Sequence, residues 1–79
     1  MIEKMIVYST VGCVECGYVK NLLEQEEVAY EVRDVMESEQ YQQEVEKFGF
    51  MGVPVTVFRE QAVKGFNPDL RELIEAAKK

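Results

Sequence analysis

The stretch T-V-G-C-V-E-C-G-Y, Thr10 to Tyr18, contains both cysteines of the 79-residue chain. Cys13 and Cys16 are three positions apart, a spacing that two randomly placed cysteines reach in roughly one arrangement out of forty. The spacing alone allows three interpretations, namely a structural disulfide, half of a metal site, or a reactive pair that opens and closes. The residues on either side distinguish among them.

The pair lies where a predicted strand ends and a predicted helix begins. The apolar run Met5 to Tyr8 is rich in residues that suit a pleated sheet. From Glu15 onward, apolar residues recur at helical spacing, at Val19, Leu22 and Leu23. A cysteine pair at the first β-to-α junction of a βαβ unit is typical of a thioredoxin-like redox site.

The middle of the chain continues the alternation of strands and helices. The side chains of residues 28–33 alternate in polarity and predict a second strand, and Asp34 is expected to begin the segment that leaves this strand. Three large residues at helical spacing predict a second helix, which Gly49 ends in a left-handed conformation; they are Tyr41, Val45 and Phe48. Residues 52–58 predict a third strand, and residues 62–64 a fourth, although the turn between them lacks glycine.

The last helix has clear start signals. Asn67 is a good N-cap, Pro68 suits the first helical position, and Asp69 meets the positive end of the helix dipole. Its inner stripe is Leu70, Leu73, Ile74 and Ala77. The complete order is βαβαββα, an α/β fold. Right-handed crossovers predict a mixed four-stranded sheet flanked by three helices.

Length and composition exclude several classes of function. Seventy-nine residues with 47% hydrophobic content predict one domain over residues 1–79, with no room for a deep cleft. The net charge of −6 argues against binding to nucleic acid or to an anionic membrane. No run is long enough for a membrane span or a signal-peptide core, so we expect a cytoplasmic protein. Thiols are held reduced there, which disfavours a structural disulfide.

The two cysteines are not equivalent in a first helical turn. Cys13 falls near the N-cap, where unpaired backbone N–H groups and the helix dipole favour negative charge. We therefore expect a lowered pKa for Cys13 and a thiolate that attacks disulfides. Cys16 lies one turn further in and is suited to resolving the mixed disulfide. Lys20 adds positive potential, whereas Glu15 opposes thiolate formation; for both residues an ordinary solvated helix charge is an equal interpretation.

The other interpretations of the pair explain less of the sequence. A structural zinc site needs four ligands, and two cysteines without histidine supply half of them. A metal or iron–sulfur carrier would need a dimer or an outside thiol such as glutathione. A permanent disulfide over so short a loop would restrict the unfolded chain little.

Three motifs, C-V-E-C, M-G-V-P-V and K-G-F-N-P-D, occur in this order along the chain. Together they resemble the glutaredoxin-like redoxins of the thioredoxin superfamily, and most closely the small redoxins that serve ribonucleotide reductase. The resemblance implies a thioredoxin fold, Cys13 as nucleophile and Cys16 as resolving thiol. It also implies a cis peptide bond between Val53 and Pro54, which turns the backbone of Val53 toward the sulfurs and toward an extended partner segment.

The resemblance further implies a surface around the pair that binds the substrate. Its expected residues are Met51, Val53, Pro54, Gly65, Phe66 and Asp69. For Phe66, packing in the core is an equal alternative. The implied substrate is a protein disulfide, with ribonucleotide reductase as the best-supported target, and the protein is expected to act as a monomer. No bound cofactor is expected beyond the redox-active Cys13–Cys16 disulfide.

The chain departs from glutathione-using glutaredoxins at two motifs. Val14 and Glu15 replace the proline and tyrosine of C-P-Y-C. In the G-G-x-x-D segment Phe66 replaces a glycine, and Pro68 has no N–H to donate, while Asp69 remains. The departures favour a flavoprotein of the thioredoxin reductase type as electron donor. A glutathione-dependent glutaredoxin and a dimeric thiol-ligated metal or iron–sulfur carrier stay as alternatives.

The position of Glu15 between the cysteines generates a prediction about the thiol pKa. Replacing Glu15 by Gln removes a negative charge beside Cys13, so the Glu15→Gln change lowers the pKa of Cys13. Titration of the thiolate by its ultraviolet absorbance measures this fall. An unchanged or raised pKa would refute the electrostatic role assigned to this carboxylate.

Overall fold

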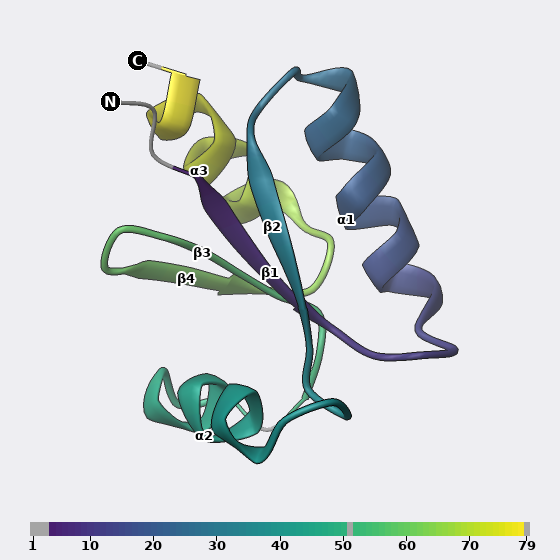
Figure 1. Ribbon diagram of the computed structural model, residues 1–79. Helices are drawn as coiled ribbons and strands as arrows, with labels where there is room; N and C mark the ends of the chain where they lie inside the picture. Colours follow the sequence, from purple (N-terminus) through teal and green to yellow (C-terminus); the bar gives the residue numbers. More distant parts are fainter. Residues whose placement is uncertain (1–3, 51, 79) are drawn as a thin grey trace.

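The computed structural model describes residues 4–50 and 52–78 (Figure 1). The elements follow the predicted βαβαββα order, and each is named here with its bounds. They are β1 (Met5–Ser9), α1 (Val14–Gln25), β2 (Tyr30–Asp34), α2 (Glu39–Lys47), β3 (Val55–Phe58), β4 (Gln61–Lys64) and α3 (Pro68–Lys78).

The four strands form one mixed sheet in the order β2-β1-β3-β4 (Figure 1). Strand β1 pairs with β2 in parallel, with Val7 opposite Val32. It pairs with β3 in the antiparallel sense, and β3 pairs with β4 in the same sense. The βαβ unit thus supplies the parallel pair, and a two-residue turn supplies the antiparallel hairpin. The thioredoxin fold expected from the sequence is confirmed.

Alternation along β1 divides the core between the two faces of the sheet. Met5 and Val7 are fully buried and pack with α1 and α3 through residues such as Leu23 and Ile74. On the opposite face of the sheet, Tyr8 packs with α2 and with Val55 and Val57 of β3. Each fully buried aliphatic side chain contributes about 1.5–3 kcal/mol to folding, so both faces are needed at this chain length.

Two strands are shorter than the sequence predicts. Strand β2 begins at Tyr30 instead of Val28, because residues 28–29 belong to the connection that follows α1. The carbonyl of Ala29 nevertheless accepts a hydrogen bond from the Met5 N–H at 3.0 Å. Asp34, expected to start the exit, is the last residue of β2. Strand β3 begins at Val55 instead of Gly52, because Pro54 has no N–H to donate to a ladder.

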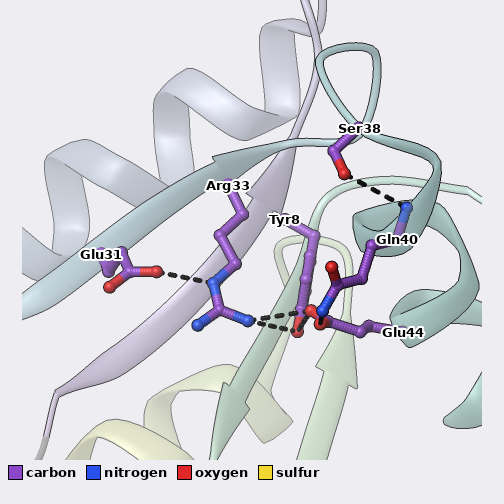
Figure 2. A network of polar contacts seen from close by, with 6 residues as sticks. All are labelled: Tyr8, Glu31, Arg33, Ser38, Gln40 and Glu44. Carbon is purple, nitrogen blue, oxygen red and sulfur yellow. Dashed lines mark hydrogen bonds and ion pairs between the residues drawn. The ribbon is translucent and has the colours of Figure 1, made fainter.

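A polar network joins β1, β2 and α2 around Arg33 (Figure 2). The Glu44 carboxylate accepts hydrogen bonds from the Tyr8 hydroxyl at 2.7 Å and from the Arg33 guanidinium at 2.8 Å. Arg33 also donates to Glu31 at 2.6 Å and lies over the rings of Tyr8 and Tyr41, 5.9 and 5.4 Å from their centroids. The network ties α2 to the sheet through a planar cation that donates from Nε to Glu31 and from Nη1 to Glu44.

This network predicts a dependence of stability on alkaline pH. Burial, with the hydrogen bond to Glu44, raises the pKa of Tyr8 to about 12. An unfolded tyrosine titrates near pH 10, so the folded state holds its proton to higher pH, and the contribution is lost as pH rises from 10 to 12. The stability difference between wild type and Tyr8→Phe therefore shrinks by about 2 kcal/mol between pH 9 and pH 12 in urea unfolding. A difference that stays constant between pH 9 and pH 12 would contradict the assignment.

Helices α1 and α2 end in the same hydrogen-bonded motif with different residues at its left-handed position. In α2, Gly49 has φ +87° and donates to the Glu46 carbonyl, and the next N–H reaches back to Val45. In α1, the same position is occupied by Glu27 with φ +58°, which donates to the Glu24 carbonyl. A side chain in the left-handed region costs about 1 kcal/mol relative to glycine.

The two helix ends form a matched experimental pair. Glu27→Gly relieves the left-handed strain and raises the free energy of unfolding by about 1 kcal/mol. Gly49→Ala introduces the same strain without a clash, because nothing lies within 4 Å of the added Cβ, and lowers it by a similar amount. Denaturant unfolding of both variants checks the account. Changes of the same sign in the two variants would contradict it.

Candidate functional site

Three chain segments meet at one end of the sheet. Tyr8 near the end of β1 pairs with Val55 at the start of β3, and Val55 pairs with Lys64 at the end of β4. The loop from β1 into α1, the loop that enters β3 and the turn from β4 into α3 therefore leave the sheet on the same side. Because the first loop holds the cysteines, the other two flank them.

Cys13 caps helix α1 with its side chain. Its backbone is extended, with φ −91° and ψ 108°, and its Sγ accepts a hydrogen bond from the Cys16 N–H at 3.1 Å. The preceding turn requires Gly12, which has φ +81°. The sulfur of the partly exposed Cys13 thus lies at the positive end of a helix. It accepts a hydrogen bond from one of the backbone N–H groups that have no partner within the helix, an environment that stabilises a thiolate.

Cys16 lies one turn deeper and is buried, with 1% of its surface exposed. The two cysteines form a disulfide, and their Cα atoms are 5.3 Å apart, within the range that a disulfide spans. Both sulfurs are thus on one face of the helix start, as the three-residue spacing predicts. Cys13 is therefore the more exposed of the two cysteines.

The loop before β3 carries the predicted cis peptide bond between Val53 and Pro54, and this prediction is confirmed. Pro54 is fully buried, and its carbonyl accepts a hydrogen bond from the Gly65 N–H at 2.8 Å. Val53 packs against the α2-side core. Met51, which the sequence places in the substrate-binding set, lies outside the described residues. The bond from Gly65 joins two of the three segments at this end of the sheet.

The turn from β4 into α3 contacts the first helix through two aromatic rings. Phe66 and Tyr18 meet edge to face, with centroids 5.9 Å apart. Phe66 is 50% exposed and belongs to neither core cluster, so the core-packing alternative for this residue is wrong. Sequence reasoning missed Tyr18. The signal was present, because Val14 and Tyr18 are four residues apart and form an apolar stripe on the face of α1 away from its core residues.

Helix α3 starts beside this turn. The Asn67 side chain accepts the Leu70 N–H at 3.3 Å, as an N-cap does, and its amide donates to the Lys64 carbonyl at 2.8 Å. Asp69 is exposed in the first turn of α3. Proline at the first helical position leaves this N-terminus with one backbone donor fewer. The amides that could hold a carboxylate are therefore reduced in number and partly occupied.

The chain and its fold are similar to those of known proteins. The family model described as Glutaredoxin matches residues 5–63, which include β1 to most of β4 and the cysteine pair. The chain belongs to the glutaredoxin family. It is 32% identical over 62 residues to the glutaredoxin-like protein NrdH of Lactococcus lactis subsp. lactis, covering 78% of this chain and 86% of that protein.

Solved structures within the superfamily share this fold. The thioredoxin-like protein BC3987 matches with a TM-score of 0.80 at 26% identity, covering 90% of this chain and 99% of that one. Glutaredoxin grx-1 from Archaeoglobus fulgidus matches with a TM-score of 0.75 at 29% identity, covering 92% and 87%. NrdH-redoxin from Escherichia coli, at 23% identity and a TM-score of 0.79, covering 92% of both chains, shows the fold alone.

Family membership and the bonded cysteine pair together define the chemistry. This glutaredoxin-family protein is a thiol–disulfide oxidoreductase, and the Cys13–Cys16 disulfide occupies the C-x-x-C position. Across residues 4–50 and 52–78, no group of three or more histidine, cysteine, aspartate or glutamate side chains could hold a metal ion. Within the same residues, no helix combines the length and apolar character needed to cross a membrane.

The surface on the β2 side of Cys13 is polar. A shallow depression there is lined by Cys13 and Lys20 together with the acids Asp34 and Glu37. On the other side, Glu15 extends toward the β4–α3 turn, where its carboxylate lies 3.5 Å from the position that a Gly65 Cβ would take. The exposed sulfur is therefore surrounded by more acidic than basic side chains.

Proposed function

We propose that this glutaredoxin-family protein reduces disulfides in protein targets, with Cys13 as attacking thiol and Cys16 as resolving thiol. One observation carries the assignment of roles. Cys13 is partly exposed and caps α1 through the N–H of Cys16, whereas Cys16 is 99% buried. Only the first sulfur combines access to solvent with the helix field that stabilises a thiolate.

The reaction consists of two thiol–disulfide exchanges. The Cys13 thiolate attacks one sulfur of the target disulfide, the target S–S bond breaks, and the other target sulfur leaves as a thiolate that takes up a proton. Cys16, after losing its proton, then attacks Cys13 in the mixed disulfide. The Cys13–Cys16 bond forms, and the second target sulfur leaves as a thiol. Two electrons pass from the protein to the target, and the product is the disulfide state of the structure.

The target segment docks, in this proposal, on the apolar residues around the pair. Val11 and Val14 are exposed beside the cysteines, and Tyr18 and Phe66 continue this surface toward α3. We expect the backbone of Val53 and the residues Pro54, Gly65 and Asp69 to border this surface. Exposed apolar side chains of this size around a reactive sulfur are typical of a protein-binding surface.

Electrons come from a flavoprotein of the thioredoxin reductase type in this proposal, and ribonucleotide reductase is the favoured target. The resemblance to the small redoxins that serve ribonucleotide reductase supports the target. The N-terminus of α3, where Pro68 lacks an N–H and Asn67 occupies another donor, supports an electron donor other than glutathione. A protein disulfide reductase of this kind acts as a monomer in a reducing compartment, which we propose to be the cytoplasm.

A trapping experiment tests the assignment of roles. The Cys16→Ser variant keeps the attacking thiol but cannot resolve the mixed disulfide, so it retains target proteins from a cell extract. Mass spectrometry identifies them after release by dithiothreitol. The Cys13→Ser variant serves as the matched control and is expected to retain at least tenfold less protein. Retention by Cys13→Ser in place of Cys16→Ser would reverse the roles.

The electron donor is tested with the wild-type protein. Turnover of a disulfide substrate is measured with NADPH and thioredoxin reductase, and separately with glutathione, glutathione reductase and NADPH. The proposal predicts that turnover is faster with thioredoxin reductase than with glutathione and glutathione reductase. Faster turnover with glutathione would identify a glutathione-dependent glutaredoxin, and colour with bound iron in anaerobically purified protein would identify a cluster carrier.

A further inference from the structure

We infer that Glu15 is a specificity-determining residue, whose carboxylate selects against anionic thiols and disulfides at the Cys13–Cys16 pair. The inference rests on the proposed function and adds the charge class of the reaction partner. It follows from the place of this side chain in the first turn of α1, beside the β4–α3 turn.

The position of the carboxylate follows from the first turn of α1. Glu15 lies in the first turn of α1, the same turn that holds the two cysteines. Its Oε2 lies 3.5 Å from the place of a Cβ on Gly65, and the Gly65 N–H is bonded to the carbonyl of Pro54. The carboxylate therefore lies beside the β4–α3 turn, at the point where this turn is bonded to the loop that enters β3.

The charges around the pair do not neutralise this carboxylate. Asp34 and Glu37 line the depression beside Cys13, and Asp69 is exposed in the first turn of α3. The cations near these segments include Lys20, in the same depression, Lys64, whose Nζ lies 3.6 Å from the place of a Gly52 Cβ, and Arg71, which lines a depression with Tyr18 and Phe66. The acids still outnumber these cations, in a chain whose net charge is −6. A partner with additional negative charge therefore meets a net negative surface around Glu15.

Small thiols of different charge can be used to measure this selection without a protein partner. A thiolate RS⁻ attacks Cys13 in the oxidised protein, the Cys13–Cys16 bond breaks, and Cys16 leaves as a thiolate. A second thiolate attacks the mixed disulfide, and RSSR leaves as Cys13 becomes a thiolate. The attacking thiolates of glutathione, 2-mercaptoethanol and cysteamine carry net charges of about −2, −1 and 0 at neutral pH. Effects on the protein's own sulfurs are shared by all three reagents and cancel in a ratio of rates.

The experiment compares second-order rate constants per thiolate for the three reagents at low ionic strength. Glu15→Gln is expected to raise the ratio of the glutathione rate to the cysteamine rate about fivefold. An exposed charge about 7 Å from the approaching group changes a rate roughly twofold per unit of reagent charge at low ionic strength, and the two thiolates differ by two units. The 2-mercaptoethanol rate falls between. In about 0.5 M salt the gain shrinks toward unity, because such charges are then screened.

Two control variants isolate the charge and its location. Glu15→Asp keeps the carboxylate and is expected to keep the wild-type ratio. Glu60→Gln makes the same charge change in the turn between β3 and β4, at the opposite end of the sheet, and is expected to leave the ratio unchanged. An equal rise for all three reagents in Glu15→Gln, or a rise of the same size in Glu60→Gln, would overturn the inference. If dithiothreitol did not reduce the wild-type pair, the proposed function itself would fail.

Discussion

The start of helix α1 is the constraint on which the site depends. Four N–H groups at the beginning of a helix have no partner within it, and here one of them is met by the sulfur of Cys13. The helix field and this hydrogen bond favour the charged form of the sulfur, while one turn of helix brings Cys16 close enough to form the disulfide. One local structure thus fixes the distance between the sulfurs and makes them chemically unequal.

The sheet makes the surroundings of the sulfurs predictable. Because β3 runs antiparallel to β1 and β4 returns beside it, the loop with Pro54 and the turn with Gly65 are brought to the end where β1 leads into the cysteines. The bond from the Gly65 N–H to the Pro54 carbonyl holds these two segments together. Segments more than 35 residues from the cysteines in sequence therefore form the rim of the site.

The sequence predicts the elements better than the contacts between their side chains. The strand–helix junction at the cysteines, the Gly49 helix end and the Asn67 cap follow from local rules, and all three are found. The pairing of Arg33 with Glu44 and two tyrosine rings does not, because it joins residues brought together only by packing of α2 on the sheet. For the same reason the Tyr18–Phe66 contact could not be read from two residues 48 positions apart.

The pKa of Cys13 in the reduced wild-type protein is the most direct test of the account. Thiolate absorbance followed against pH, with Cys16→Ser and Cys13→Ser assigning the two thiols, separates the sulfurs. The account predicts that Cys13 titrates at least one unit below the value of about 8.5 of a free cysteine, and that Cys16 titrates above Cys13. A Cys13 pKa at or above that of free cysteine would contradict the claim that the start of α1 makes this sulfur the attacking thiol.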